Sequence, residues 1–231
     1  ANPISAANDT GTDGTDILYV RFGSSGNIPL LDEFNETSTQ LTLDTTNANY
    51  DSLQQYDILT VGDCDGVSIF MITNDPETSG GVVQFQSGIV ASSGVNAGQS
   101  NIAGQFDAPV LAPDASVGSL ISAFRVTTNA YMVGPSSSGN GNALFVNSID
   151  PNNELIQGVE NFQVRMGVND DTDLGADRYV DADDLVASDW NNVVSVRVDM
   201  RLNTVDPVQG GSTIAKDFTM TVRLRNRGDV I

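Results

Sequence analysis

The sequence predicts a mainly β protein, in which antiparallel sheets are connected by long loops and accompanied by one or two short helices. Three observations support this fold class. Apolar and polar residues alternate over many short runs, which is typical of half-buried strands. The polar residues are rich in Asp, Asn, Ser, Thr and Gly, which favour turns and strand edges over helix interiors. Patterns that indicate helices are scarce.

The first two thirds of the chain contain several short candidate strands. Clusters of Gly, Ser and Asn, such as residues 92–94 and 136–141, lie between these runs and indicate exposed loops. The expected strands are residues 16–22, 67–73, 82–86, 121–127, 130–133 and 143–147.

Three runs in the last third alternate most regularly between apolar and polar residues. Their apolar faces consist of Phe162, Val164, Met166 and Val168, of Val194, Val196, Val198, Met200 and Leu202, and of Phe218, Met220, Val222 and Leu224. The intervening residues of the second and third runs are polar or charged, for example Arg197, Asp199 and Asp217. We therefore expect the second and third runs to pair as antiparallel neighbours, with an ionic face opposite the apolar one.

Only two segments have the features of helices. Residues 181–188 are expected to form about two turns with acidic residues at the N-terminal end, and residues 51–56 about one turn. Trp190 comes just before the strand expected at 194–202. We expect its ring to cover one end of the core.

The charge of the chain argues against several classes of partner. The formal net charge is −20 at pH 7, which disfavours binding to nucleic acid or to an anionic membrane surface. No stretch reaches the roughly 18 to 20 apolar residues needed to cross a bilayer. The sequence begins at Ala1-Asn2-Pro3 without an initiator Met. It is therefore expected to be a processed or truncated piece.

The residues needed for most catalytic centres are missing. The chain has no histidine, which is the commonest general base. It has thirty acidic residues, so that no pair stands out as a glycosidase dyad. Cys64 is the only cysteine, and it is either a small buried apolar residue or the partner of a cysteine outside this segment. The sequence therefore predicts that the protein is not an enzyme.

An Asp-rich loop, residues 169–177, is the one compact constellation of possible metal ligands. Oxygen-bearing side chains occupy positions one, three, five and nine of this loop, namely Asn169, Asp171, Asp173 and Asp177. This spacing is typical of a curled calcium-binding loop. Leu174 stands where such a loop needs Gly, and Val180 stands where it needs a closing acid. Two interpretations remain open, a weak Ca²⁺ site formed by these four residues and a solvated acidic turn.

Several blocks along the chain carry a resemblance to a known family. Segments 155–165, 177–182, 190–198 and 218–227 read LIQGVENFQVR, DRYVDA, WNNVVSVRV and FTMTVRLRNR. Earlier segments, YDILTVGDC at 56–64 followed by SIF at 68–70, and the pair 130–133 and 143–145, fit the same series. The order and spacing of these blocks resemble the PilW family of type IV pilus minor pilins.

The resemblance implies a pilin-like α+β head, residues 1–231, without the N-terminal helix of a pilin. In the family, this helix anchors the subunit in the inner membrane and later packs in the filament core. The resemblance thus implies membrane contact only through the missing helix, which is also where a partner of Cys64 would lie. It implies a structural role in priming pilus assembly and in the complex at the fibre tip. The implied partners are other minor pilins and the major pilin, and the implied location is the extracellular fibre of a Gram-negative bacterium, after an inner-membrane and periplasmic intermediate.

Two alternatives stay open beside this interpretation. One is a type II secretion pseudopilin of the J type, whose head has a similar layout. The other is a secreted, calcium-dependent adhesive or carbohydrate-binding β module, which the Asp-rich loop permits. Pilus-dependent adhesion and twitching motility are further expectations from the family resemblance.

Overall fold

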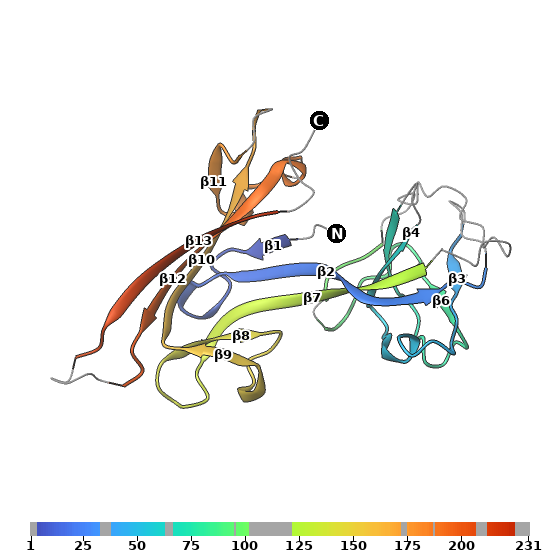
Figure 1. The fold of residues 1–231 in the computed structure, drawn as a ribbon, viewed down its shortest axis with the longest axis horizontal. Helices are drawn as coiled ribbons and strands as arrows, with labels where there is room; N and C mark the ends of the chain where they lie inside the picture. Colours follow the sequence, from blue (N-terminus) through green and yellow to red (C-terminus); the bar gives the residue numbers. More distant parts are fainter. Residues whose placement is uncertain are drawn as a thin grey trace. The chain divides into compact units, whose positions relative to one another are not determined.

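A computed structural model describes residues 4–32, 38–62, 67–94, 96–101, 122–171, 175–186, 188–206 and 212–224 (Figure 1). Strands account for 52% of the structure and helices for 9%, and the sheets are antiparallel, which confirms the predicted mainly β class. No helix in these residues is both long enough and apolar enough to cross a membrane.

The described strands are numbered in chain order. They are β1 (Ile4–Ala7), β2 (Ile17–Pro29), β3 (Gln40–Thr42), β4 (Ile58–Gly62), β5 (Val67–Met71), β6 (Val82–Gln84), β7 (Ser122–Pro135), β8 (Asn142–Val146), β9 (Glu154–Gln157), β10 (Val159–Val168), β11 (Arg178–Val180), β12 (Val193–Asn203) and β13 (Ala215–Arg223). The short 3-10 helices are η1 (Thr12–Gly14), η2 (Tyr50–Ser52), η3 (Pro151–Asn153), η4 (Ala182–Asp184) and η5 (Asp189–Asn192).

The chain divides into two compact units. Unit 1 consists mainly of residues 21–128, and unit 2 of residues 2–20 and 129–231. Strands β2 and β7 therefore contribute residues to both units. This division does not test the prediction of a single head over residues 1–231, because two units can belong to one head.

Unit 1 has a core of its own, built from short strands. Strand β3 pairs with β6, and β4 pairs with β5 and with the first part of β7. The buried cluster comprises Ile28, Leu30, Leu41, Leu43, Tyr50, Leu53, Leu59, Val61, Phe70, Ile72, Val83, Phe85 and Ala123. Phe70 and Phe85 are each 2% exposed, and their ring centroids are 4.4 Å apart.

In unit 1, polar side chains bind backbone N–H and C=O groups where strand pairing ends. The buried amide of Asn101 accepts a hydrogen bond from the Met71 backbone N–H (2.7 Å) and donates one to the Met71 carbonyl (2.8 Å). The Asn101 side chain thus replaces a neighbouring strand at the end of β5. Similarly, the Tyr50 hydroxyl donates to the Pro76 carbonyl (2.6 Å) and accepts from the Gly81 N–H (3.0 Å). These bonds satisfy backbone groups that burial would otherwise leave without a partner.

Unit 2 contains the most regular strands. Its second sheet has the order β11-β10-β12-β13, with antiparallel pairing throughout. Strand β1 pairs with β2, and the second part of β7 pairs with β8, which pairs with β9. The buried cluster comprises Ile4, Leu18, Val133, Val159, Phe162, Val164, Met166, Val168, Val193 and Val196. Trp190 packs against this cluster, which confirms its predicted position at the core.

Asp16 joins the N-terminal segment of unit 2 to β10. Its backbone N–H donates to the Phe162 carbonyl (2.9 Å), and its carboxylate accepts from the Val164 N–H (2.6 Å) and from the Asp9 N–H (2.9 Å). The residue is only 1% exposed. Desolvation raises the pKa of the Asp16 carboxyl above its usual value, although both backbone hydrogen bonds act in the opposite direction.

The structure shortens one predicted helix, shifts the other and joins two predicted strands. Residues 181–188 do not form two turns, because only η4 is helical and Leu185 is already extended. The Asp181 side chain makes no capping hydrogen bond, and a single uncapped turn does not propagate. In the segment 51–56, about one turn was predicted, and the single turn η2 covers Tyr50–Ser52; the following Leu53 is extended and buried in the core. The strands expected at 121–127 and 130–133 are one strand, β7, whose two parts pair with β4 and with β8.

Candidate functional site

The sheet β11-β10-β12-β13 has two chemically different faces. The strand register places Phe218, Met220 and Val222 of β13 opposite three apolar residues of β12, namely Met200, Val198 and Val196. These in turn lie opposite Phe162, Val164 and Met166 of β10. One face of the sheet is therefore apolar from β10 to β13, as the alternation predicted.

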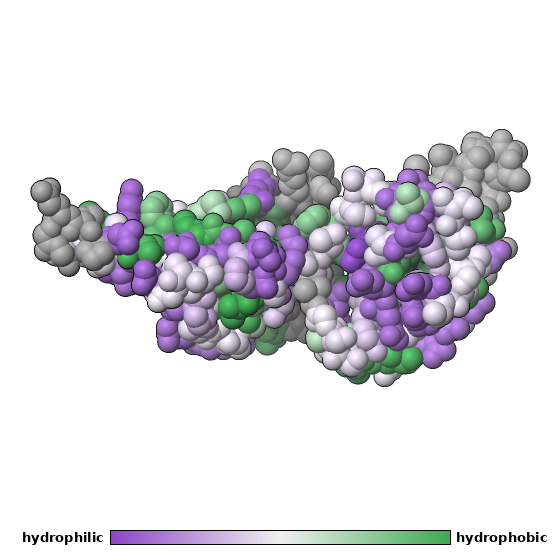
Figure 2. All heavy atoms as spheres, turned by 90° about the horizontal axis from the view of Figure 1, so that it is seen from below, coloured by the Kyte–Doolittle hydropathy of each residue, from purple (hydrophilic) through white to green (hydrophobic). Residues whose placement is uncertain are grey.

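The apolar face becomes progressively exposed from β10 towards β13. On β10, Phe162, Val164 and Met166 are at most 3% exposed. On β12, Val196 is buried, whereas Val198 and Met200 are only partly buried. On β13, Phe218, Met220 and Val222 are 42%, 59% and 47% exposed. Figure 2 shows that hydrophobic residues (green) lie among hydrophilic residues (purple) on the surface. We call the three β13 side chains the apolar patch.

Ion pairs and hydrogen bonds hold the opposite face together. Arg201 pairs with Glu160 on β10 (3.0 Å) and with Asp217 on β13 (3.7 Å). On the same face, the Thr219 hydroxyl donates to the Asp199 carboxylate (2.5 Å), and the Arg197 guanidinium donates to the Thr221 hydroxyl (3.4 Å). The predicted ionic face is thus confirmed. These pairs are exposed, so they order the strand register more than they stabilise the fold.

The Asp-rich loop is closed by hydrogen bonds between its own residues. The Asp177 carboxylate accepts from the Asp170 N–H (2.7 Å), and the Asn169 side chain accepts from the Asp171 N–H (3.0 Å). Arg178 binds the Asp170 carboxylate at 2.7 Å, a partner that the sequence did not predict. This contact raises the pKa of Arg178.

The structure describes only part of the predicted metal site. Asn169, Asp171 and Asp177 belong to one loop, whereas Asp173 lies outside the described residues. Among the residues that are described, no group of three or more Asp, Glu or Cys side chains is arranged to hold a metal ion. With one predicted ligand undescribed, Ca²⁺ binding stays a prediction.

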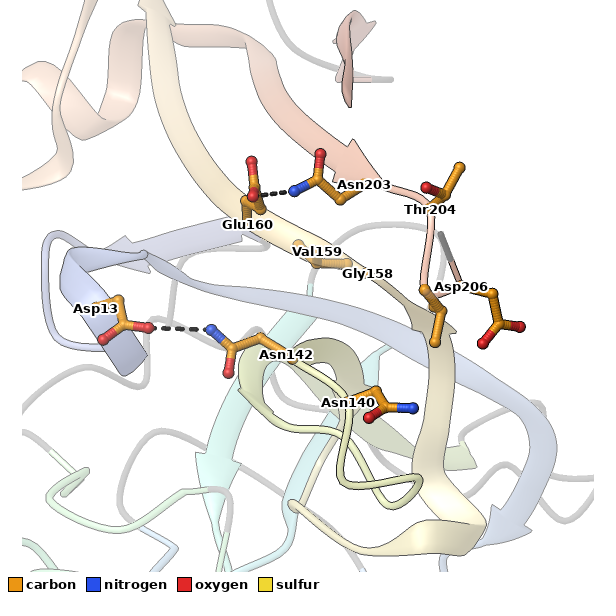
Figure 3. Close-up of a pocket in the computed structure, with 11 residues that line it drawn as sticks. Asp13, Asn140, Asn142, Gly158, Val159, Glu160, Asn203, Thr204 and Asp206 are labelled. Carbon is orange, nitrogen blue, oxygen red and sulfur yellow. Dashed lines mark hydrogen bonds between the residues drawn. The ribbon is translucent and has the colours of Figure 1, made fainter. Parts of the chain in front are cut away.

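A polar groove of about 780 Å³ lies elsewhere in unit 2 (Figure 3). Asp13, Asn142, Glu160 and Asn203 line it, and they form two hydrogen-bonded pairs, Asn142 with Asp13 (3.0 Å) and Asn203 with Glu160. The described lining residues include no aromatic ring on which a sugar could stack. No local motif could have predicted this groove, because its residues come from four distant segments of the chain.

A comparison with protein families identifies a match to part of the chain. Residues 130–213 match the family model PilW, whose description is Type IV Pilus-assembly protein W. No curated protein and no solved structure gives a match. The matched residues include β8 to β12, and with them the blocks at 155–165, 177–182 and 190–198. The blocks at 56–73 and 218–227 lie outside the match, so their resemblance stays a prediction.

Proposed function

We propose that this PilW-like chain is a structural minor pilin, which takes part in priming type IV pilus assembly and in the complex at the fibre tip. The family match over residues 130–213 supports a role related to type IV pili. It also implies a location in the periplasm or in the extracellular pilus. The proposed partners are other minor pilins and the major pilin, and the proposed action is protein–protein contact without turnover.

The observation that carries this proposal is the apolar patch on β13. Its three side chains continue the apolar face of a sheet whose strands β10 and β12 lie in the PilW-like region. Completing the burial of one half-exposed Phe, Met or Val side chain contributes about 1 kcal/mol, so the patch offers roughly 3 kcal/mol to a subunit contact. A partner subunit with an apolar surface would gain this free energy on assembly.

Phe218→Ser tests the patch, with Val186→Ser as its matched control. Both wild-type side chains are large, apolar and exposed, but Val186 lies in the connection between η4 and η5 and is not part of the apolar patch. Each variant is introduced into the full-length gene. Piliation, twitching and co-purification with the other minor pilins are then measured.

We expect Phe218→Ser to reduce pilus number and co-purification, whereas Val186→Ser leaves both at the wild-type level. Circular dichroism melts of both purified heads check that the fold is retained. If deletion of the whole gene left piliation and twitching unchanged, and the heads formed no complex with other minor pilins, the proposed function would be wrong.

A further inference from the structure

Strand β13 is the last strand of its sheet, and none of the described strands pairs with its outer edge. The sheet order ends at β13, and all nine of its residues are exposed. The Leu224 N–H donates to the Val194 carbonyl (2.8 Å), and the Ile214 carbonyl accepts from the Thr204 N–H (3.0 Å). Even-numbered residues therefore direct their backbone groups towards the preceding strand. Because these groups alternate in direction along an antiparallel strand, the odd-numbered residues 215–223 direct theirs outward.

We infer that two copies of this chain pair through β13, antiparallel and about a two-fold axis at Met220. In this register, Asp217 faces Arg223 of the second copy, Thr219 faces Thr221, and Phe218 faces Val222. The outward-directed residues 217, 219, 221 and 223 then exchange about eight backbone hydrogen bonds with the same residues of the other copy. The contact is isologous, since each copy contributes the same strand.

Charge complementarity favours this register over the next one towards the N-terminus of β13. The two-fold axis places Asp217 of each copy beside Arg223 of the other, which gives two ion pairs. Asp217 is 77% exposed even though it lies 3.7 Å from Arg201, so its carboxylate remains accessible to a second cation. A shift of the axis to Thr219 would place Asp217 opposite Thr221 and lose both pairs.

The apolar patch is continuous across the proposed dimer. Even-numbered side chains of both copies lie on one face, so Met220 meets Met220 at the axis, with Phe218 and Val222 on either side. The net charge of −20 per chain opposes association. At physiological salt this repulsion is screened beyond about 8 Å, whereas the two edge ion pairs lie well within that distance. We therefore expect a weak, concentration-dependent dimer.

Single cysteines test the register directly in a Cys64→Ser background, which removes the native thiol. Opposed residues of a non-hydrogen-bonded pair have Cα atoms about 4.5 Å apart, within the range of about 4.4 to 6.8 Å that a disulfide spans. Met220→Cys should therefore form a disulfide-linked dimer under mild oxidation. Phe218→Cys alone should form no disulfide-linked dimer. A mixture of the Phe218→Cys and Val222→Cys variants should form one, because residues 218 and 222 of the two copies face each other.

Charge reversal tests the same pairing in solution. Asp217→Arg alone and Arg223→Asp alone should each weaken dimerisation about tenfold or more. The double variant, which exchanges the two charges, should bring the dissociation constant back to within about threefold of wild type. Sedimentation velocity measures the dimer, and thermal melts check that each variant is folded.

The dimer is refuted if wild type sediments only as a 24.4 kDa monomer at about 1 mM. The register is refuted if Thr221→Cys cross-links to itself in place of Met220→Cys. This inference does not depend on the pilus role. The charge-reversal variants change the ionic face and leave the apolar patch intact, so a failed dimer and a failed pilus function are distinguishable.

Discussion

Replacing Asp16 tests how the N-terminal segment of unit 2 is attached to β10. In Asp16→Ala the Val164 N–H loses its acceptor in a buried position, and the Asp9 N–H loses an acceptor near the surface. An unsatisfied buried donor costs about 1 to 3 kcal/mol, and water can replace the lost partner of Asp9. Removal of a desolvated carboxylate offsets part of this cost. We therefore expect Asp16→Ala to lower the free energy of unfolding by about 2 kcal/mol at pH 7.

The pH dependence of Asp16→Asn isolates the ionisation of this group. Because the folded-state pKa of Asp16 is raised above its ordinary value of 3.8, the folded protein holds this proton more tightly than the unfolded chain does. The stabilisation that comes from protonation of Asp16 is therefore fully present below pH 3.8 and is lost as the pH rises through the raised folded-state pKa. Asn does not titrate, so the stability advantage of wild type over Asp16→Asn should shrink as the pH rises through this window.

Urea unfolding of wild type and both variants at a series of pH values measures these differences. The slope m should stay constant, which would show that the compactness of the end states is unchanged. If Asp16→Ala were as stable as wild type at pH 7, the carboxylate would not be the essential partner of Val164. A wild-type advantage over Asp16→Asn that did not vary with pH would contradict the raised pKa.

Three further predictions follow from local geometry. Asn101→Ala removes both hydrogen bonds to Met71 and should destabilise the chain by about 1 to 3 kcal/mol in urea unfolding, with Asn152→Ala, at an exposed position, as the control. Gly158→Ala should lower the free energy of unfolding by about 2 kcal/mol or more, because φ is +79° and an added Cβ would lie 2.1 Å from the Asn203 carbonyl oxygen. Gly139→Ala controls for backbone strain alone, because Gly139 has a φ of +77° and open space around it. If the Asp-rich loop binds Ca²⁺, calorimetry should show heat of binding, and the melting temperature should be higher in Ca²⁺ than in chelator. Asp177→Asn should weaken both signals. The absence of both signals in wild type would rule the site out.

The sequence predicted best where one face of a strand is apolar and the other is charged. The alternation in β12 and β13 was sufficient to predict their antiparallel pairing and their ionic face, because a register slip of one residue would reverse both faces. The same pattern does not reveal whether an apolar face is covered. Phe218 and Phe162 occupy equivalent positions in the alternation, yet only Phe162 is buried. Coverage depends on tertiary neighbours that alternation does not specify.

Other features could not be predicted from short stretches of sequence, because they depend on contacts between distant residues or on too few positions. Asp16 reads as an ordinary turn residue, since its partner Val164 is 148 positions away in the chain. The short strands β3 and β11, of three residues each, carry too few positions for a period to be recognised. In the Asp-rich loop the sequence identified the acidic residues but not the Asp170–Arg178 pair, because an ion pair depends on side-chain direction as well as spacing.

The discontinuity of unit 2 has a consequence for how the chain acquires its structure after synthesis. Strand β1 and Asp16 emerge before residues 21–128, whereas the backbone groups that Asp16 binds belong to β10, which emerges only after all of them. Unit 1 has all of its residues by Thr128 and is able to fold early. Residues 2–20 cannot complete their contacts until β10 has been made. Folding of unit 2 therefore has a high contact order and is expected to be slower than folding of unit 1. Until then the N-terminal segment stays available to proteases and chaperones, and pulse proteolysis during refolding should find it protected last.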